Sequence, residues 1–184
     1  MNRAARLQPY LLMAVFLGPL LLAAVAYFAG WRSSAAPHGE LLDTPAPLPE
    51  LALTTSSGTL TSQDLLQRRW SLIYVAQAQC NLDCVEQLNR INQVRLALGK
   101  DMGRAQVVLL YTGPAPRLPD RADVILVSLD DSAGRAMGEF FATSTAGDRE
   151  IFVTDPLGRL VIAYGPDVAR RELLEDIERL LAVL

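Results

Sequence analysis

The hydropathy pattern divides the chain into three parts. Residues 7–31 contain no charged side chain, and residues 10–29 form a nearly continuous apolar run. A helix of about 20 apolar residues can cross the hydrocarbon core of a bilayer, which is roughly 30 Å thick. A proline-rich segment without apolar periodicity follows, and then a long segment of alternating apolar runs. We therefore expect residues 1–31 to be a cytoplasmic stub and transmembrane anchor, 32–47 a Pro/Ala-rich tether, and 48–184 one folded domain.

The charges on either side of the apolar run predict its orientation. Arg3 and Arg6 precede the run, whereas Arg32 follows it and is soon followed by Glu40 and Asp43. The positive-inside rule then keeps the N-terminus cytoplasmic. The run is longer than the apolar core of a cleaved signal peptide, which spans about 7 to 15 residues. In a bacterial cell, we expect a single-pass inner-membrane protein whose C-terminal domain lies in the periplasm.

Apolar periodicity within residues 48–184 predicts strands that alternate with helices. The expected strands cover residues 51–55, 59–61, 70–76, 106–111, 124–129, 151–154 and 160–164. The expected helices are a short one capped by Thr61 or Ser62, then residues 81–98, one capped by Asp130 or Asp131 and ending at Phe141, and one from Asp167 to Leu184. This order, with a late hairpin and a closing helix, predicts an α/β three-layer sandwich of the thioredoxin-like type.

The charge balance excludes some classes of function. Removing Arg3, Arg6 and Arg32 from the 17 basic residues leaves 14 against 20 acidic residues, a net charge of −6 outside the anchor. This charge gives no support for nucleic-acid binding and favours a basic partner surface. The single histidine, His38, lies in the expected tether, so the domain holds no Ser/His/Asp set, and no glycine-rich phosphate loop is present.

The two cysteines, Cys80 and Cys84, follow the expected strand 70–76 directly and stand where a helix begins. Cys84 shares the apolar helix face with Leu88 and Ile91, so we expect it to be buried. Cys80 lies at or before the first turn, where unpaired N–H groups and the helix dipole favour a thiolate. We predict that Cys80 is the attacking thiol and Cys84 the resolving thiol.

Other interpretations of the pair remain open. The cysteines can be small core residues or form a static bridge, and the charge of Asp83 opposes thiolate formation beside them. A disulfide at this spacing requires Cys80 to lie off the ideal helix, since the two Cα atoms must come within about 4.4 to 6.8 Å. An oxidising compartment favours cysteines that cycle or form a disulfide.

Several segments resemble the Sco/SenC family in order and spacing. They are Leu48–Leu53, Gly58 before Thr61, Arg69–Tyr74, the C-x-x-x-C motif of Cys80 and Cys84, and Asp155–Leu160. Sco/SenC proteins are membrane-anchored, thioredoxin-like factors that help to mature the copper centre of cytochrome c oxidase. The C-x-x-x-C spacing favours this family, because ordinary thioredoxin-type oxidoreductases use C-x-x-C.

The chain departs from the family at the copper site. The resemblance implies that copper is held by the two thiolates and by a histidine in the loop at residues 142–150, but this loop contains no histidine. The family's prolines after the cysteines are replaced by Asn81 and Val85. Two thiolates without a third ligand suit a linear Cu(I) site.

The candidate copper ligands are therefore Cys80 and Cys84, with Cu(I) as the metal. His38 is interpreted as a solvated tether residue, Asp148 as a loop charge and Met137 as a core residue of its helix, rather than as further ligands.

The resemblance implies a factor that assists cytochrome c oxidase assembly by thiol–disulfide exchange or Cu(I) handling. Its partner would be an oxidase subunit or another assembly factor. Two alternatives are a general membrane-tethered thiol–disulfide oxidoreductase and a non-redox scaffold or binding protein whose cysteines are structural. Any enzymatic activity would be at most thiol–disulfide oxidoreduction.

Overall fold

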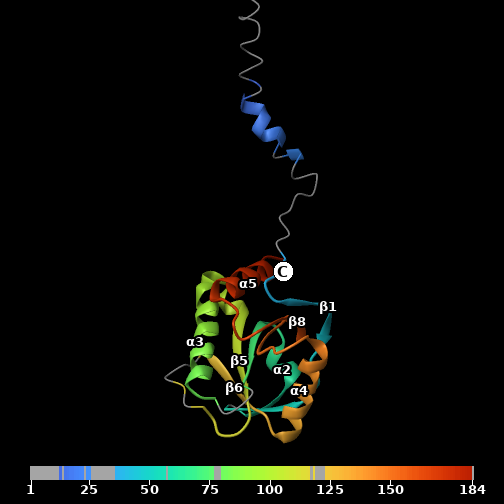
Figure 1. Ribbon diagram of the computed structural model, residues 1–184, viewed down its shortest axis with the longest axis vertical. Coiled ribbons are helices and arrows are strands. Elements are labelled where there is room, and N and C mark those ends of the chain that lie inside the picture. Colours follow the sequence, from blue (N-terminus) through green and yellow to red (C-terminus); the bar gives the residue numbers. More distant parts are fainter. Residues whose placement is uncertain are drawn as a thin grey trace, which may run out of the picture. The chain divides into compact units, whose positions relative to one another are not determined.

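The computed structural model describes residues 13, 15–22, 24–25, 36–56, 58–76, 80–116, 118 and 123–183 (Figure 1). The chain consists of two units, Met1–Ala36 and Pro37–Leu184. Residues 15–22 of the first unit are helical. Within the described ranges, no helix is both long and apolar enough to cross a membrane. Most of the predicted anchor lies outside these ranges, so it stays a prediction.

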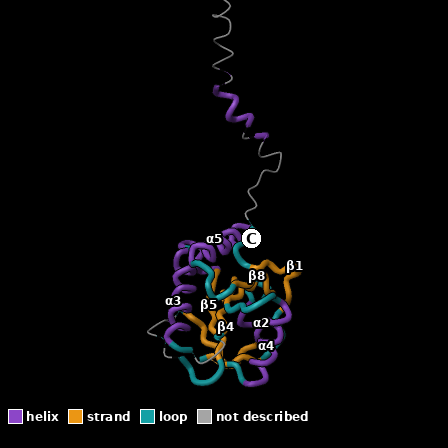
Figure 2. The backbone as a smooth tube through the Cα atoms, in the orientation of Figure 1, coloured by secondary structure: helices purple, strands orange, loops and turns teal. Residues whose placement is uncertain are grey.

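An eight-stranded mixed sheet forms the centre of the second unit, in the order β1-β8-β7-β4-β5-β6-β2-β3 (Figures 1 and 2). Three parallel strands lie in the middle, and the other strands add to them in antiparallel fashion. The strands are β1 (Glu40–Pro47), β2 (Ala52–Thr55), β3 (Gly58–Thr61), β4 (Trp70–Val75), β5 (Ala105–Tyr111), β6 (Val124–Ser128), β7 (Ile151–Thr154) and β8 (Arg159–Tyr164).

Helices cover both faces of the sheet. On one face, α3 (Leu82–Ala97) and α5 (Arg170–Val183) pack over one apolar cluster, and on the other α2 (Ser62–Leu66) and α4 (Asp131–Ser144) pack over a second (Figure 1). Neighbouring residues of β4 enter different clusters, because successive side chains of a strand point to opposite faces. Leu72 lies in the α3/α5 cluster and Ile73 in the α2/α4 cluster. The predicted thioredoxin-like sandwich is therefore confirmed for this unit.

The first strand differs from the prediction. Residues 32–47 were expected to be a tether, whereas Glu40–Pro47 pairs with β8 as the edge strand β1, with a register shift between Leu41 and Ala46. Proline lacks a donor for the sheet ladder, so it is tolerated in a strand chiefly at an edge. The prolines that indicated a tether are compatible with this edge position, and the folded unit begins at Pro37 rather than at Leu48.

Two helix boundaries also differ. The last helix was expected to begin at Asp167 but begins at Arg170, where the Glu172 carboxylate accepts a hydrogen bond from the Ala169 N–H at 3.2 Å. The helix expected to end at Phe141 continues to Ser144. A 3₁₀ helix, η1 (Gly99–Arg104), follows α3 and has no counterpart in the prediction.

Candidate functional site

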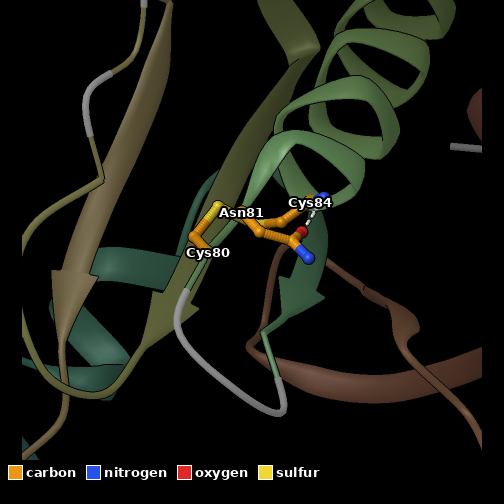
Figure 3. The surroundings of a disulfide bond; sticks show 3 residues. All are labelled: Cys80, Asn81 and Cys84. Carbon is orange, nitrogen blue, oxygen red and sulfur yellow. Dashed lines mark hydrogen bonds between the residues drawn. A yellow bond between two sulfur atoms is a disulfide. The ribbon is translucent and has the colours of Figure 1, made fainter.

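Cys80 and Cys84 are joined by a disulfide at the beginning of α3 (Figure 3). The chain leaves β4 at Val75 and reaches Cys80 two residues before the first residue of the helix, Leu82. The Cα atoms of the two cysteines lie 5.1 Å apart, within the range that a disulfide requires. The position of Cys80 outside the helix, which this bond needs, is confirmed.

Asn81 fixes the geometry between the two cysteines. Its backbone is extended, with φ −88° and ψ −165°, and its Oδ1 accepts a hydrogen bond from the Cys84 N–H at 3.1 Å. This is an N-cap, which satisfies a backbone donor that the first helical turn leaves unpaired. The residue that replaces a family proline therefore starts the helix. The capping role of Asn81 was not predicted, although an asparagine before an apolar helical pattern is a known signal for the start of a helix.

The two sulfurs differ in accessibility. Cys84 is 6% exposed and lies in the α3/α5 cluster with Tyr74, Leu88 and Ile91, so its predicted burial is confirmed. Cys80 is partly buried and packs against the edge of this cluster. Attack on a disulfide needs a line of approach to one sulfur. Cys80 is the sulfur that a partner can reach more readily.

Several acidic residues lie near the end of β4, the strand that precedes the cysteines. Residues 148–150 lie against β4, where the Val75 N–H donates to the Glu150 carbonyl at 2.9 Å, and the Gln87 side chain of α3 donates to the Pro166 carbonyl at 2.6 Å. Burial raises the pKa of Glu150, and the charges of Asp148 and Asp167 raise it further. Asp83, which stands between the two cysteines in the sequence, is the acidic residue that opposes a thiolate there.

Two acidic residues also affect the ionisation of Tyr74 in β4. Burial raises the pKa of its phenol to about 12, and the negative charges of Glu150 and Asp83 contribute. An unfolded tyrosine ionises near pH 10, so between about pH 10 and 12 the folded protein holds a proton that the unfolded chain releases. We expect the stability that Tyr74 contributes to be complete below pH 10 and lost as the pH rises to 12. A spectrophotometric phenol titration, compared with Tyr74→Phe, measures this pKa; a transition near 10 assigned to Tyr74 would contradict it.

The histidine that the Sco/SenC resemblance implies as a third copper ligand has no replacement among the described residues. Met137 is buried inside α4, and Asp148 is an exposed loop residue, as predicted. No group of three or more His, Cys, Asp or Glu side chains in the described ranges could hold a metal ion. The donor set therefore does not fit a three-coordinate site, and the two cysteine sulfurs are the metal donors that remain.

His38 is exposed, as predicted, but it has a partner within the folded unit. Its N–H donates to Asp176 Oδ2 at 2.8 Å, and its Nδ1 lies 3.2 Å from Asp176 Oδ1. His38 is thus a surface residue of the folded unit rather than of a free tether, because the buried carboxylate of α5 contacts both its backbone and its ring. This contact gives the histidine a structural role within the domain.

Comparisons with known proteins agree with this fold. A protein family described as "transmembrane-like, thioredoxin-like, C-terminal domain" matches residues 70–183. No curated protein matches the sequence.

Many solved structures are similar. Apo Sco1 from Thermus thermophilus is 23% identical with a TM-score of 0.60, covering 83% of this chain and 100% of its own. Copper-bound ScoI from Bradyrhizobium japonicum is 20% identical with a TM-score of 0.54, covering 73% and 99%. A protein described as the thiol:disulfide interchange protein DsbE from Chlorobium tepidum is 16% identical with a TM-score of 0.54, covering 78% and 99%. The resemblance to Sco proteins is thus confirmed at the level of the fold.

Proposed function

Because the chain belongs to the family of transmembrane-like, thioredoxin-like C-terminal domains, we propose that it is a Sco-like factor that assists cytochrome c oxidase assembly by thiol–disulfide exchange. The observation that carries the proposal is the Cys80–Cys84 disulfide at the start of the helix that follows β4. Its accessible sulfur and its buried sulfur suit the attacking and resolving roles. The partner would be a cysteine-containing oxidase subunit or another assembly factor.

The exchange is a two-electron reaction in two steps. In the reduced protein, the Cys80 thiolate attacks a disulfide of the partner, forms a mixed disulfide, and one partner sulfur leaves as a thiolate. The Cys84 thiolate then attacks Cys80 Sγ, which forms the Cys80–Cys84 bond and releases the reduced partner. In the opposite direction, a partner thiolate attacks Cys80 Sγ and displaces Cys84. A second partner thiolate then attacks the partner sulfur of the mixed disulfide, which releases reduced Cys80 and oxidises the partner.

Copper would enter this scheme as cargo. When the disulfide is reduced, Cys80 and Cys84 offer two soft sulfur donors, which suit Cu(I) in linear coordination. The missing third ligand argues against storage of Cu(II). Thiol–disulfide exchange would therefore be the main activity, and copper handling a secondary one.

Location forms part of the proposal. The uncharged apolar run at residues 10–29 and the preceding arginines support a single-pass anchor in the inner membrane, with the N-terminus cytoplasmic and the domain periplasmic. A tethered domain would meet membrane-bound oxidase subunits at a high effective concentration.

A scaffold with a structural disulfide is the second candidate. The burial of Cys84 and the charge of Asp83 beside the cysteines favour it, because both disfavour the thiolates that exchange requires. This protein would act in assembly through surface contacts alone.

The reduction potential separates these two functions. We expect the purified protein, equilibrated with dithiothreitol buffers and quantified by thiol alkylation, to show a potential above about −300 mV, whereas structural disulfides lie below this value. After reduction, iodoacetamide should modify Cys80 faster than Cys84. The reduced protein should also bind one Cu(I), and Cys80→Ser should lose this binding. A potential below about −300 mV together with an unreactive Cys80 would support the scaffold instead.

A further inference from the structure

A cavity of about 440 Å³ lies beside Trp70, at the beginning of β4. The disulfide follows the other end of this strand, which six residues extend by about 16 Å at the usual rise. We propose that this cavity binds a small organic monoanion, namely a carboxylate carried by an apolar group. This site is separate from the proposed exchange site. It is assigned from a buried donor without a partner, an unpaired cation and a strained backbone, which belong to residues that line one cavity.

The unpaired donor belongs to Trp70. This residue is 4% exposed and lines the cavity, and its indole N–H is buried without a hydrogen-bond partner in the described structure. Buried polar groups without partners are rare in folded proteins, and each needs an explanation. Because this N–H is itself closed to solvent, a ligand in the cavity would lie against the Trp70 side chain, and the N–H would report binding through the change in its surroundings.

Three arginines line the same cavity, and two of them are paired. Arg159 donates to Asp155 Oδ2 through Nε at 2.8 Å and Nη2 at 2.6 Å. Arg104 donates to Asp101 at 3.3 Å and to the Leu181 carbonyl at 3.1 Å.

The third arginine, Arg68, has no ion pair or side-chain hydrogen bond with the described residues. Because two aspartates balance two of the arginines, one positive charge remains. This charge complements a monoanion, and Asp155, which also lines the cavity, would repel a more highly charged ligand. A planar guanidinium matches the two oxygens of a carboxylate.

The backbone of Arg68 is strained. Its φ is +75°, and Arg68 is the non-glycine residue with positive φ in the described ranges. Its N–H donates to the Pro156 carbonyl at 2.9 Å, so the turn between β7 and β8 holds this conformation in place. Glycine would adopt it without strain, and strained residues cluster at ligand clamps. Binding by the side chain accounts for an arginine at a position that favours glycine.

Apolar side chains complete the wall of the cavity. Leu157, which is 67% exposed, lines it together with Pro156 and the Trp70 ring. The expected ligand therefore has an anionic group that contacts Arg68 and an apolar body that contacts these three residues. Both a free aliphatic acid and the C-terminal residue of a peptide carry this chemistry.

The test follows the Trp70 indole signal by NMR in the purified protein, assigned with Trp70→Phe. N-acetyl-leucine, which mimics a peptide C-terminus, and octanoate are the two carboxylate probes. We expect a saturable shift with at least one of them, and the tighter probe identifies the source. N-acetyl-leucine amide, which lacks the carboxylate, should cause no shift. Absence of a shift with both acids at about 10 mM, or an equal shift with the amide, would overturn the proposal.

Variants of two adjacent arginines separate binding from folding. Arg68→Gly should weaken binding at least about tenfold while it raises the melting temperature, because glycine relieves the strained φ. Arg69→Gln, a neighbour that does not line the cavity, should bind like the wild type. Unchanged affinity in Arg68→Gly would overturn the proposal. The double serine variant of Cys80 and Cys84 should bind normally, so this site and the exchange function can fail independently.

Discussion

Cys84→Ser is expected to accumulate a stable mixed disulfide with a partner thiol, whereas Cys80→Ser is expected to form almost none. In the first variant Cys80 can attack a partner disulfide, but the resolving sulfur is absent and the adduct persists. In the second variant the remaining thiol is buried against Leu88 and Ile91, so a partner cannot reach it. Turnover should fall to background in both variants, because neither can complete the two-step exchange.

The measurement mixes each reduced variant with glutathione disulfide and quantifies adducts by intact mass. The wild type is the control and should pass through the adduct to the Cys80–Cys84 disulfide. Equal adduct formation by the two single-cysteine variants would contradict the assigned roles. No adduct with either variant would favour a structural disulfide.

Apolar periodicity was enough to predict the sandwich. The central strands were predicted correctly because helices cover both of their faces. Their residues are therefore almost continuously apolar, as in residues 105–111. The disulfide could also be anticipated from the sequence. A strand that runs into a helix at Cys80 brings the sulfurs of Cys80 and Cys84 close together along a short stretch of chain. These predictions rest on short-range relations along the chain.

Contacts between distant segments could not be predicted in the same way. The prolines of Glu40–Pro47 do not indicate that this segment pairs with β8, which is more than 100 residues away in the sequence. The cavity at Trp70 likewise depends on a long-range contact, in which the Arg68 N–H donates to the Pro156 carbonyl of the β7–β8 turn. Such contacts form only when the sheet is assembled, so the local pattern of polar and apolar residues does not predict them.

The contact between His38 and Asp176 belongs to this class. In the sequence, Asp176 is one of several acidic residues on an amphipathic helix and is not distinguished from the others. In the structure its side chain is only 1% exposed. Its carboxylate accepts hydrogen bonds from the N–H groups of His38 at 2.8 Å and Gly39 at 3.4 Å, and from the Tyr164 hydroxyl at 3.1 Å. Gly39 permits this approach, because a Cβ there would come within 2.5 Å of the Tyr164 ring. Burial and the Asp176 charge raise the pKa of the Tyr164 phenol.

Asp176→Ala should lower the free energy of unfolding by about 3 to 5 kcal/mol, because it leaves the buried Tyr164 hydroxyl and two part-buried N–H groups without an acceptor. Arg179, which lies 3.3 Å from Asp176 Oδ1, would also lose one of its ion pairs and keep the one with Glu175. Urea unfolding followed by circular dichroism measures the loss. Glu175→Ala is the matched control, since it removes a neighbouring carboxylate whose pairs lie at the surface, and it should cost less than about 1 kcal/mol. The pKa of Tyr164 should fall in Asp176→Ala. Equal stability of the two variants would show that the carboxylate does not hold His38 against the domain.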